Sequence, residues 1–241
     1  MNALAMPAAA LAFEKIVFVD LETTALDPTR GGESWEFGLI VRRRGKPDEE
    51  WQVMVRPDLD RADPQALRIG RYYERTAGLS DADGSWHDLA GESDDGWRRW
   101  SDPFAFARWL APTLDGAVLI GSNASFDAGH LRPWLRHHGQ ALICHYRPVD
   151  IGAVAWGFYL GTAFGERPDG AGADERALTL PWSSTSLAEG LGVHSDPAHR
   201  HEALADARHV RDVFDRVLSL AGLTSRTPVP VPVPYSDEPP F

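Results

Sequence analysis

The sequence contains a single cysteine, Cys144, and no apolar run close to the ~20 residues that span a bilayer. One cysteine excludes an internal disulfide, and this composition is typical of a reducing compartment. We therefore expect a cytoplasmic protein with no membrane attachment. A lone cysteine can also serve as a nucleophile, but no pattern around Cys144 resembles a Cys–His pair.

Basic side chains are also scarce. Lysine occurs only at Lys15 and Lys46, and 24 basic residues against 35 acidic ones give a net charge of −11. This acidity argues against binding long stretches of duplex through phosphate contacts. It is compatible with binding a few nucleotides at a strand end, where metal ions supply the positive charge.

The composition changes twice along the chain, which predicts three regions. Residues 1–13 are rich in alanine, lack the basic start of a signal peptide and are expected to form a flexible leader. Residues 14–222 are long enough for a domain with a large core. Residues 223–241 are the expected tail, because the alternating prolines and valines of 228–234 require an extended chain.

The hydrophobic pattern of residues 14–222 predicts an α/β domain in which helices cover a mixed sheet. Expected strands cover residues 16–19, 35–44, 49–55, 117–120 and 143–149, and the second and third form a hairpin. Expected helices cover residues 64–76, 103–114, 126–138, 151–160, 184–191 and 202–220. Residues 80–101 are expected to form a loop, and the glycine-rich residues 161–182 an irregular insertion.

Two acids stand at the end of the first apolar strand. Asp20 and Glu22 are two positions apart, so on a strand both side chains project from the same face. Close carboxylates repel each other unless a positive charge lies between them. The alternative is a solvated pair of acids at a strand end, and Asp-x-Glu alone is weak evidence against it.

A third acid, Asp127, begins the helix that follows a buried strand. Asn123 or Ser125 is placed to cap this helix. A carboxylate in a first helical turn also complements the helix dipole, and for Asp127 alone this purely structural explanation is the stronger one.

The last helix carries a fourth acid. Its apolar stripe places Asp206 at the stripe edge, half turned towards the interior, where an unpaired carboxylate is costly. His201 lies five residues earlier and would point about 140° away in a regular helix, so we place it in the preceding loop or first turn. Its near-neutral pKa suits a general base. His199 is the rival base if this register is wrong; otherwise it is expected at the surface, like His194 and His209.

Four carboxylates and one imidazole are the groups that a two-metal phosphodiesterase needs. The three segments Phe18-Val19-Asp20-Leu21-Glu22-Thr23-Thr24, Asn123-Ala124-Ser125-Phe126-Asp127 and His201-x4-Asp206 together resemble the DEDDh branch of the 3′–5′ exonuclease superfamily. Their order and spacing match over roughly residues 14–220. The sibling branch has Tyr-x3-Asp in the third motif, and position 202 here is Glu. One departure is Ala25, where the family usually has glycine.

This resemblance implies a ribonuclease-H-like fold with a five-stranded mixed sheet flanked by helices. It implies two Mg²⁺ or Mn²⁺ ions at the four acids, with His201 accepting a proton from the attacking water. The residues adjoining the acids are expected to contact the terminal nucleotide through the backbone, a hydroxyl and packing, respectively: Leu21, Thr23 and Phe126.

The favoured hypothesis is therefore a 3′–5′ exonuclease that releases nucleoside 5′-monophosphates from DNA, with single strands as substrate and a role in DNA repair. The alternatives are an exoribonuclease or oligoribonuclease, and an inactive module that binds nucleic acid or a partner. The last residues resemble the acidic tip of bacterial single-stranded DNA-binding proteins, which docks into basic pockets of repair and replication proteins. This tip implies partner-binding roles for Asp237, Glu238, Pro240 and Phe241, although a solvated tail that matches by chance is the plain alternative.

Overall fold

Five strands form the central sheet of the computed structural model, which describes residues 9–10, 13–90, 98–163 and 180–224. Their order is β4-β3-β2-β5-β6; β2, β3 and β4 are antiparallel neighbours, whereas β2, β5 and β6 run parallel. The strands are β2 (Lys15–Thr23), β3 (Ser34–Arg43), β4 (Glu49–Met54), β5 (Val118–Gly121) and β6 (Val149–Asp150). The expected fold class, an α/β ribonuclease-H-like fold with a five-stranded mixed sheet, is confirmed.

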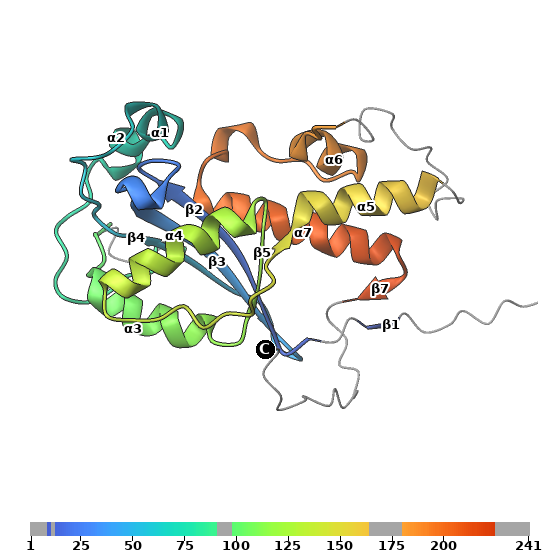
Figure 1. The fold of residues 1–241 in the computed structure, drawn as a ribbon, viewed down its shortest axis with the longest axis horizontal. Helices are drawn as coiled ribbons and strands as arrows, with labels where there is room; N and C mark the ends of the chain where they lie inside the picture. Colours follow the sequence, from blue (N-terminus) through green and yellow to red (C-terminus); the bar gives the residue numbers. More distant parts are fainter. Residues whose placement is uncertain (1–8, 11–12, 91–97, 164–179, 225–241) are drawn as a thin grey trace, which may run out of the picture.

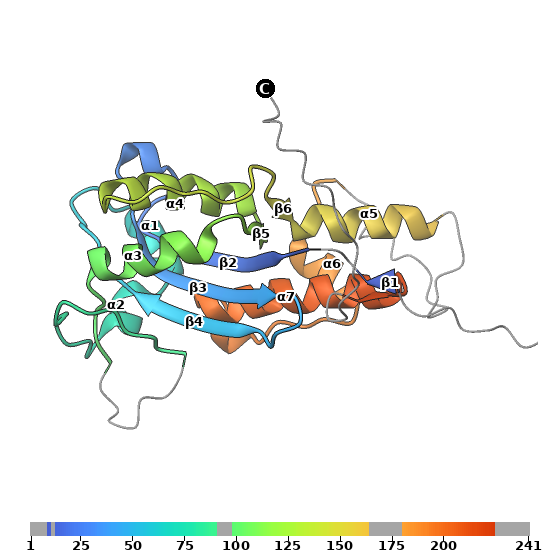
Figure 2. The same cartoon turned by 90° about the horizontal axis from the view of Figure 1, so that it is seen from below.

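Helices cover both faces of this sheet. Helices α3 (Pro103–Leu114) and α4 (Ala124–His137) pack on one face. Helices α5 (Ile151–Ala163), α6 (Ser184–Gly190) and α7 (Ala203–Leu220) pack on the other. Figures 1 and 2 show α4 and α7 on opposite sides of the strands.

The alternation of side chains along β2 divides the core into these two layers. Ile16 and Phe18 face α7, whereas Val17, Val19 and Leu21 face α3 and α4. Because the side-chain period of a strand is two residues, the positions after Phe18 on the α7 face are 20 and 22. The strand therefore carries its two acids on the side of α7.

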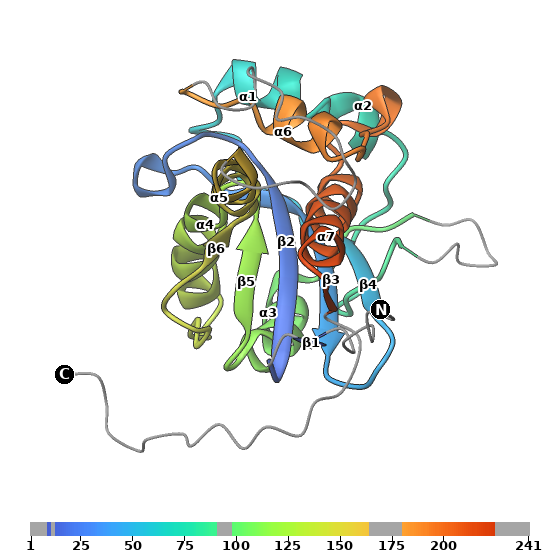
Figure 3. The same ribbon diagram turned by 90° about the vertical axis from the view of Figure 1, so that its right-hand side faces the viewer.

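The expected helix over 64–76 is wrong in one respect, because the segment is broken. It forms α1 (Pro64–Ile69) and α2 (Tyr72–Thr76), separated by Gly70 and Arg71, whose φ of 51° is left-handed. The break lets Tyr72 pack edge-on against Trp35, with 5.1 Å between ring centroids, in a small core of its own. Figure 3 shows α1, α2 and α6 on the same side of the molecule, whereas Figure 1 shows α6 separated from α1 and α2, which lie near the end of β2.

Two further expectations differ from the structure. Residues 143–148 are not a strand: β6 begins at Val149, and Ile143 and Tyr146 are 61% and 60% exposed, which leaves the segment without the packing a strand face needs. The expected insertion at 161–182 begins too early, because α5 continues to Ala163. Residues 164–179 of that insertion lie outside the described part of the chain.

The ends of the domain meet in a second small sheet. Strand β1 (Ala9–Ala10) pairs in parallel with β7 (Leu223–Thr224). Two residues of the expected leader thus pair with the first two of the expected tail. The remaining leader residues 1–8 and 11–12 and the tail residues 225–241 lie outside the description, and the three-region division stays a prediction. None of the described helices is long and apolar enough to cross a membrane.

Candidate active site

The antiparallel register of β2 and β3 determines which residues lie opposite the two acids of β2. Asp20 lies opposite Gly38, and Glu22 lies opposite Glu36. Burial and the neighbouring charges of Asp127 and Glu22 raise the pKa of Asp20 well above its usual range. Burial and then the charge of Glu36 raise the pKa of Glu22 to about 9. Carboxylates that resist ionisation in this way indicate a place where positive charge is required.

Asp127 reaches the same place from the first turn of α4. Its side chain is 4% exposed, and burial raises its pKa to about 8 despite hydrogen bonds from the backbone of Asp127 and Leu21. Asn123 occupies the N-cap position, but its side chain makes no capping hydrogen bond. The helix dipole alone therefore does not explain Asp127. A carboxylate that only complements the dipole would lie in solvent rather than among other acids.

The fourth acid comes from α7, whose first turn lies directly on β3. A Cβ atom at Gly38 would lie 2.1 Å from the backbone of Ala203, so glycine is required for this close approach. The Oδ2 atom of Asp206 accepts a hydrogen bond from the His201 amide at 3.0 Å. Ligand atoms of Glu22, His201 and Asp206 all lie within 4.8 Å of one another.

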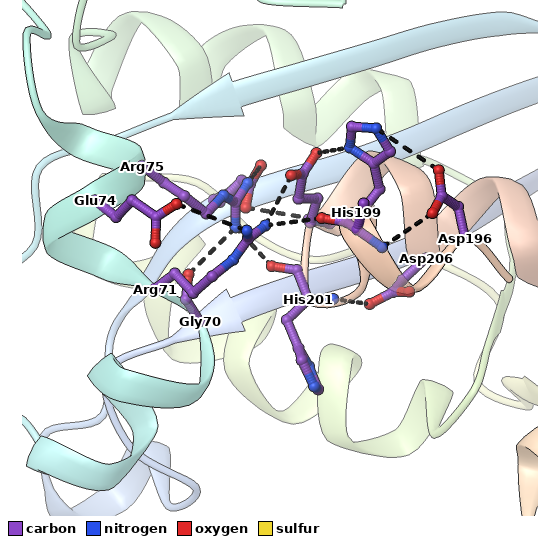
Figure 4. A network of polar contacts seen from close by, with 12 residues as sticks. Gly70, Arg71, Glu74, Arg75, Asp196, His199, His201 and Asp206 are labelled. Atoms are coloured by element: carbon purple, nitrogen blue, oxygen red, sulfur yellow. Dashed lines mark hydrogen bonds and ion pairs between the residues drawn. The ribbon is translucent and has the colours of Figure 1, made fainter.

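His201 occupies the turn before α7, as the sequence predicts, with a left-handed φ of 61°. Its carbonyl accepts a hydrogen bond from Arg75 at 2.6 Å, and Figure 4 shows the imidazole directed away from that arginine. The rival base, His199, is exposed and pairs with Glu202 at 3.2 Å and with Asp196 at 3.9 Å. The geometry therefore favours His201 over His199.

A cavity of about 280 Å³ opens beside these groups, between α5, α6 and α7. Asp20, His201 and Asp206 line it together with Arg200 and His209. The expectation of a surface position holds for His194 but is wrong for His209, whose Nδ1 atom is buried at the cavity wall. The cavity thus joins the acids to a space large enough for part of a nucleotide.

The three residues expected at the terminal nucleotide lie next to the acids. Leu21 is 6% exposed and packs into the core. Thr23 is 9% exposed and pairs with Ser34, just after a shift in the register between β2 and β3. Phe126 is partly exposed and its ring is tilted against that of His130, with 4.5 Å between centroids. Their contacts with substrate stay a prediction.

Two residues beside the acids were not predicted from the sequence. Glu36 is fully buried opposite Glu22, and Arg75 is 8% exposed and forms an ion pair with it. Glu36 had no signal, because the sequence gives no register for the pairing of β2 with β3. Arg75 had no signal either, because its position depends on the break between α1 and α2.

The donor set fits divalent cations. It offers carboxylate oxygens, which Mg²⁺ and Mn²⁺ prefer, and one imidazole. The pKa values of Asp20, Glu22, Asp127 and Asp206 are all raised, with burial as the first cause. Neutralising cations would remove the like-charge repulsion that these four groups otherwise share.

Comparison with solved structures shows the same fold in exonuclease I. The zinc-bound E. coli ExoI–ssDNA complex superposes with a TM-score of 0.57 at 15% identity, covering 86% of this chain and 41% of that chain. Apo exonuclease I gives 0.56 at 16% identity, with 87% and 43% covered. An ExoI/SSB-Ct complex gives 0.55 at 16% identity, with 87% and 42% covered.

This likeness concerns the fold, and it is partial. The chain corresponds to about two fifths of the length of the exonuclease I chains that it matches. No protein-family model matches the sequence. A search of curated proteins also gives no match.

Proposed function

We propose that this protein is a metal-dependent 3′–5′ exonuclease of the DEDDh type, which releases nucleoside 5′-monophosphates from the 3′ end of single-stranded DNA. The observation that carries the proposal is the convergence of four distant acids and one histidine. β2, α4, α7 and the turn before α7 bring them to a single place beside a cavity. A fold shared with exonuclease I supports it.

Asp20, Glu22, Asp127 and Asp206 are the proposed ligands of two Mg²⁺ or Mn²⁺ ions. When bound, such ions lower the pKa of an attacking water and stabilise the charge on the leaving oxygen. Such ions would supply positive charge at the scissile phosphate, so the proposed function does not require a chain rich in basic side chains.

His201 is the proposed general base. His201 lines the cavity, and its backbone is held on both sides, by Asp206 through the amide and by Arg75 through the carbonyl. An imidazole beside the space for water is suited to accept a proton. Leu21, Thr23 and Phe126 are the proposed contacts of the terminal nucleotide.

DNA is favoured over RNA for two reasons. Fold relatives include complexes described as exonuclease I with ssDNA, dA16 and dT13 oligonucleotides. The tail resembles the tip of single-stranded DNA-binding proteins, which also suggests a role in DNA repair. An exoribonuclease or oligoribonuclease is the alternative, and recognition of a 2′-hydroxyl near the terminal sugar would distinguish it.

We also propose that Asp237, Glu238, Pro240 and Phe241 bind a basic pocket on a repair or replication protein. These residues lie outside the described part of the chain. The proposal is supported by the sequence resemblance of the tip and by the fold relative described as an ExoI/SSB-Ct complex.

The test of the main proposal is a nuclease assay with the purified full chain. Single strands of DNA and RNA, each labelled at the 5′ end, are incubated with Mg²⁺ or Mn²⁺, and the products are separated by length. We expect stepwise shortening of DNA from the 3′ end, release of 5′-monophosphates, and complete inhibition by EDTA. Faster shortening of RNA would select the ribonuclease alternative. Binding without cleavage of either strand would select the inactive module.

A further inference from the structure

A buried ion pair lies beside the proposed active site and belongs to none of its expected motifs. Arg75 of α2 donates a short hydrogen bond to Glu36 of β3, and the two side chains are 8% and 0% exposed. Gln52 on β4 donates to the same carboxylate oxygen at 2.6 Å. The guanidinium also lies over Trp35, 5.2 Å from the ring centroid. These contacts fix the position of the pair.

Both members of the pair reach the segment that carries His201. Arg75 uses its other terminal nitrogen to donate to the His201 carbonyl at 2.6 Å. The second carboxylate oxygen of Glu36 accepts a hydrogen bond from the Ala203 amide at 3.4 Å, at the start of α7. Figure 4 shows Arg75 directed at the backbone of this turn, while the His201 ring points away from it. The pair therefore holds the backbone and leaves the imidazole free.

The turn requires such support because its conformation is unfavourable. His201 has a φ of 61°, a left-handed value that is uncommon for a residue with a side chain. Such conformations persist where the surrounding structure over-determines them. Here Asp206 fixes the amide side of His201 and Arg75 fixes the carbonyl side. Both peptide groups that flank the residue are thus immobilised by charged side chains.

The electrostatic cost of the pair argues for a role beyond stability. Glu36 lies directly opposite Glu22, and its charge is among the causes that raise the pKa of Glu22. A buried ion pair is often no more stabilising than apolar side chains of the same volume. Apolar residues at these two positions would fill the space, but they would leave the His201 carbonyl and the Ala203 amide without these partners.

We propose that Arg75 and Glu36 are positioning residues that hold the turn of His201 so that its imidazole faces the reacting water. The proposal rests on the proposed exonuclease activity. A planar guanidinium can donate to Glu36 and to the His201 carbonyl at once, whereas the single ammonium of a lysine cannot reproduce that fork. The break between α1 and α2 at Gly70 and Arg71 gives Arg75 its position in the fold.

The kinetic test is a double-mutant cycle of Arg75→Lys and His201→Ala, measured on a 5′-labelled oligonucleotide. Arg42→Lys is the matched control, because Arg42 is also a buried, paired arginine but contacts Asp48 and Asp215, away from the turn. We expect Arg75→Lys to lower kcat about 10–100-fold with little change in KM, since a small misplacement of a catalytic group has this effect. In a protein that already carries His201→Ala, the same change should lower kcat less than about threefold, because the two residues act as a unit.

Glu36→Gln is the second variant, in case Arg75→Lys does not fold. It keeps the side-chain volume and one acceptor, so we expect a smaller fall in kcat in the same direction. Full kcat in a folded Arg75→Lys or Glu36→Gln protein would overturn the proposal. So would an equal fall in kcat in the Arg42→Lys control, or a fall that multiplies fully with that of His201→Ala.

A spectroscopic readout separates this proposal from the proposed function. In the metal-free protein, the NMR signals of the His201 amide and ring should shift or broaden in Arg75→Lys and stay unchanged in Arg42→Lys. Unchanged His201 signals in Arg75→Lys would overturn the positioning role even if the protein is a nuclease. If the wild-type chain cleaves no oligonucleotide, the exonuclease proposal fails, whereas the spectra still test whether Arg75 fixes the turn.

Discussion

Asp206 accepts a hydrogen bond from the backbone amide of His201, with 3.0 Å between oxygen and nitrogen. The proposed metal ligand and the proposed base are therefore joined through the backbone rather than through their reactive groups. Any change that displaces the carboxylate also releases the turn that carries the imidazole. A variant of Asp206 would therefore alter both the proposed metal site and the turn of the proposed base.

Asp127→Asn separates the metal role from the turn of His201. We expect this variant to lose most of its exonuclease activity, since one of the proposed ligands is removed. In EDTA at about pH 9, above the raised pKa of Asp127, it should unfold at a higher temperature than wild type, because a buried carboxylate becomes a neutral amide. Activity assays and thermal unfolding with and without Mn²⁺ check both expectations. Asp212→Asn, an exposed acid of α7 paired with Arg211, is the control. Full activity of Asp127→Asn would contradict the ligand assignment.

His201→Ala should lower kcat by about 10²–10⁴-fold, which is the usual contribution of a general base. KM for the oligonucleotide should change little, because the ring is not a proposed nucleotide contact. His199→Ala should keep wild-type activity, since His199 is exposed and pairs with Glu202 and Asp196 outside the cavity. Steady-state kinetics on the same substrate decide between the two. The reverse pattern would make His199 the base.

The stability of the metal-free protein should fall as the pH rises. The pKa of Glu22 is raised to about 9 and that of Asp127 to about 8, whereas carboxyl groups of an unfolded chain titrate near 4. Between these values the folded state retains protons that the unfolded state has released, so its advantage is complete below about pH 4 and is lost towards pH 9.

Urea unfolding in EDTA at several pH values between about 6 and 9 measures this loss. The same series with Mn²⁺ should show a flatter dependence, since bound cations favour the ionised carboxylates. A free energy of unfolding that rises with pH over this range in EDTA would contradict the buried, mutually repelling cluster.

Gly38→Ala should damage both the fold and the site. The new Cβ atom would lie 2.1 Å from the Ala203 backbone, so the first turn of α7 must move away from β3. We expect a loss of about 1–3 kcal/mol in the free energy of unfolding, as for other overpacked positions. Activity should also fall, because Asp206 and His201 move with the helix. Gly129→Ala, on α4 with open space around it, should show neither effect. Chemical denaturation and the nuclease assay measure the two consequences.

Deletion of residues 235–241 tests the tail. The shortened chain should keep its exonuclease activity and lose binding to a protein with a pocket for an acidic, Phe-terminated peptide. Exonuclease I is a suitable probe, because a fold relative is described as its complex with SSB-Ct. Fluorescence anisotropy with the labelled full chain and with the deletion variant compares the two affinities. Equal affinities would assign the tail no part in such binding.

The pattern of the sequence predicted the features that depend on local periodicity. The apolar run of residues 16–19 predicted a buried strand, the two-residue period of a strand placed Asp20 and Glu22 on one face, and the stripe of α7 oriented Asp206. The placement of His201 before the helix followed from the angle between side chains in a helix. The gathering of the acids required the family resemblance as well, because nothing local relates residue 127 to residue 20.

The parts that were missed depend on tertiary contacts. The break at Gly70 and Arg71 has no proline and follows from packing of Tyr72 on Trp35. The short β6 was overestimated because Ile143 has a high strand propensity but no partner face in the core, and propensity is a weak guide without packing. The contact of Arg75 with Glu36 could not be predicted from the sequence, because it depends on the break that directs α2 towards β3.

The pairing of β1 with β7 has a consequence for how the protein engages other molecules. Helix α7 begins next to Asp206 and ends beside β7, so residue 224 lies about 20 Å from the acids along the helix axis. A molecule that contacts the β1–β7 sheet would therefore lie a helix length away from the acids. Under the proposed function, binding there would leave the cavity beside Asp20 and Asp206 uncovered.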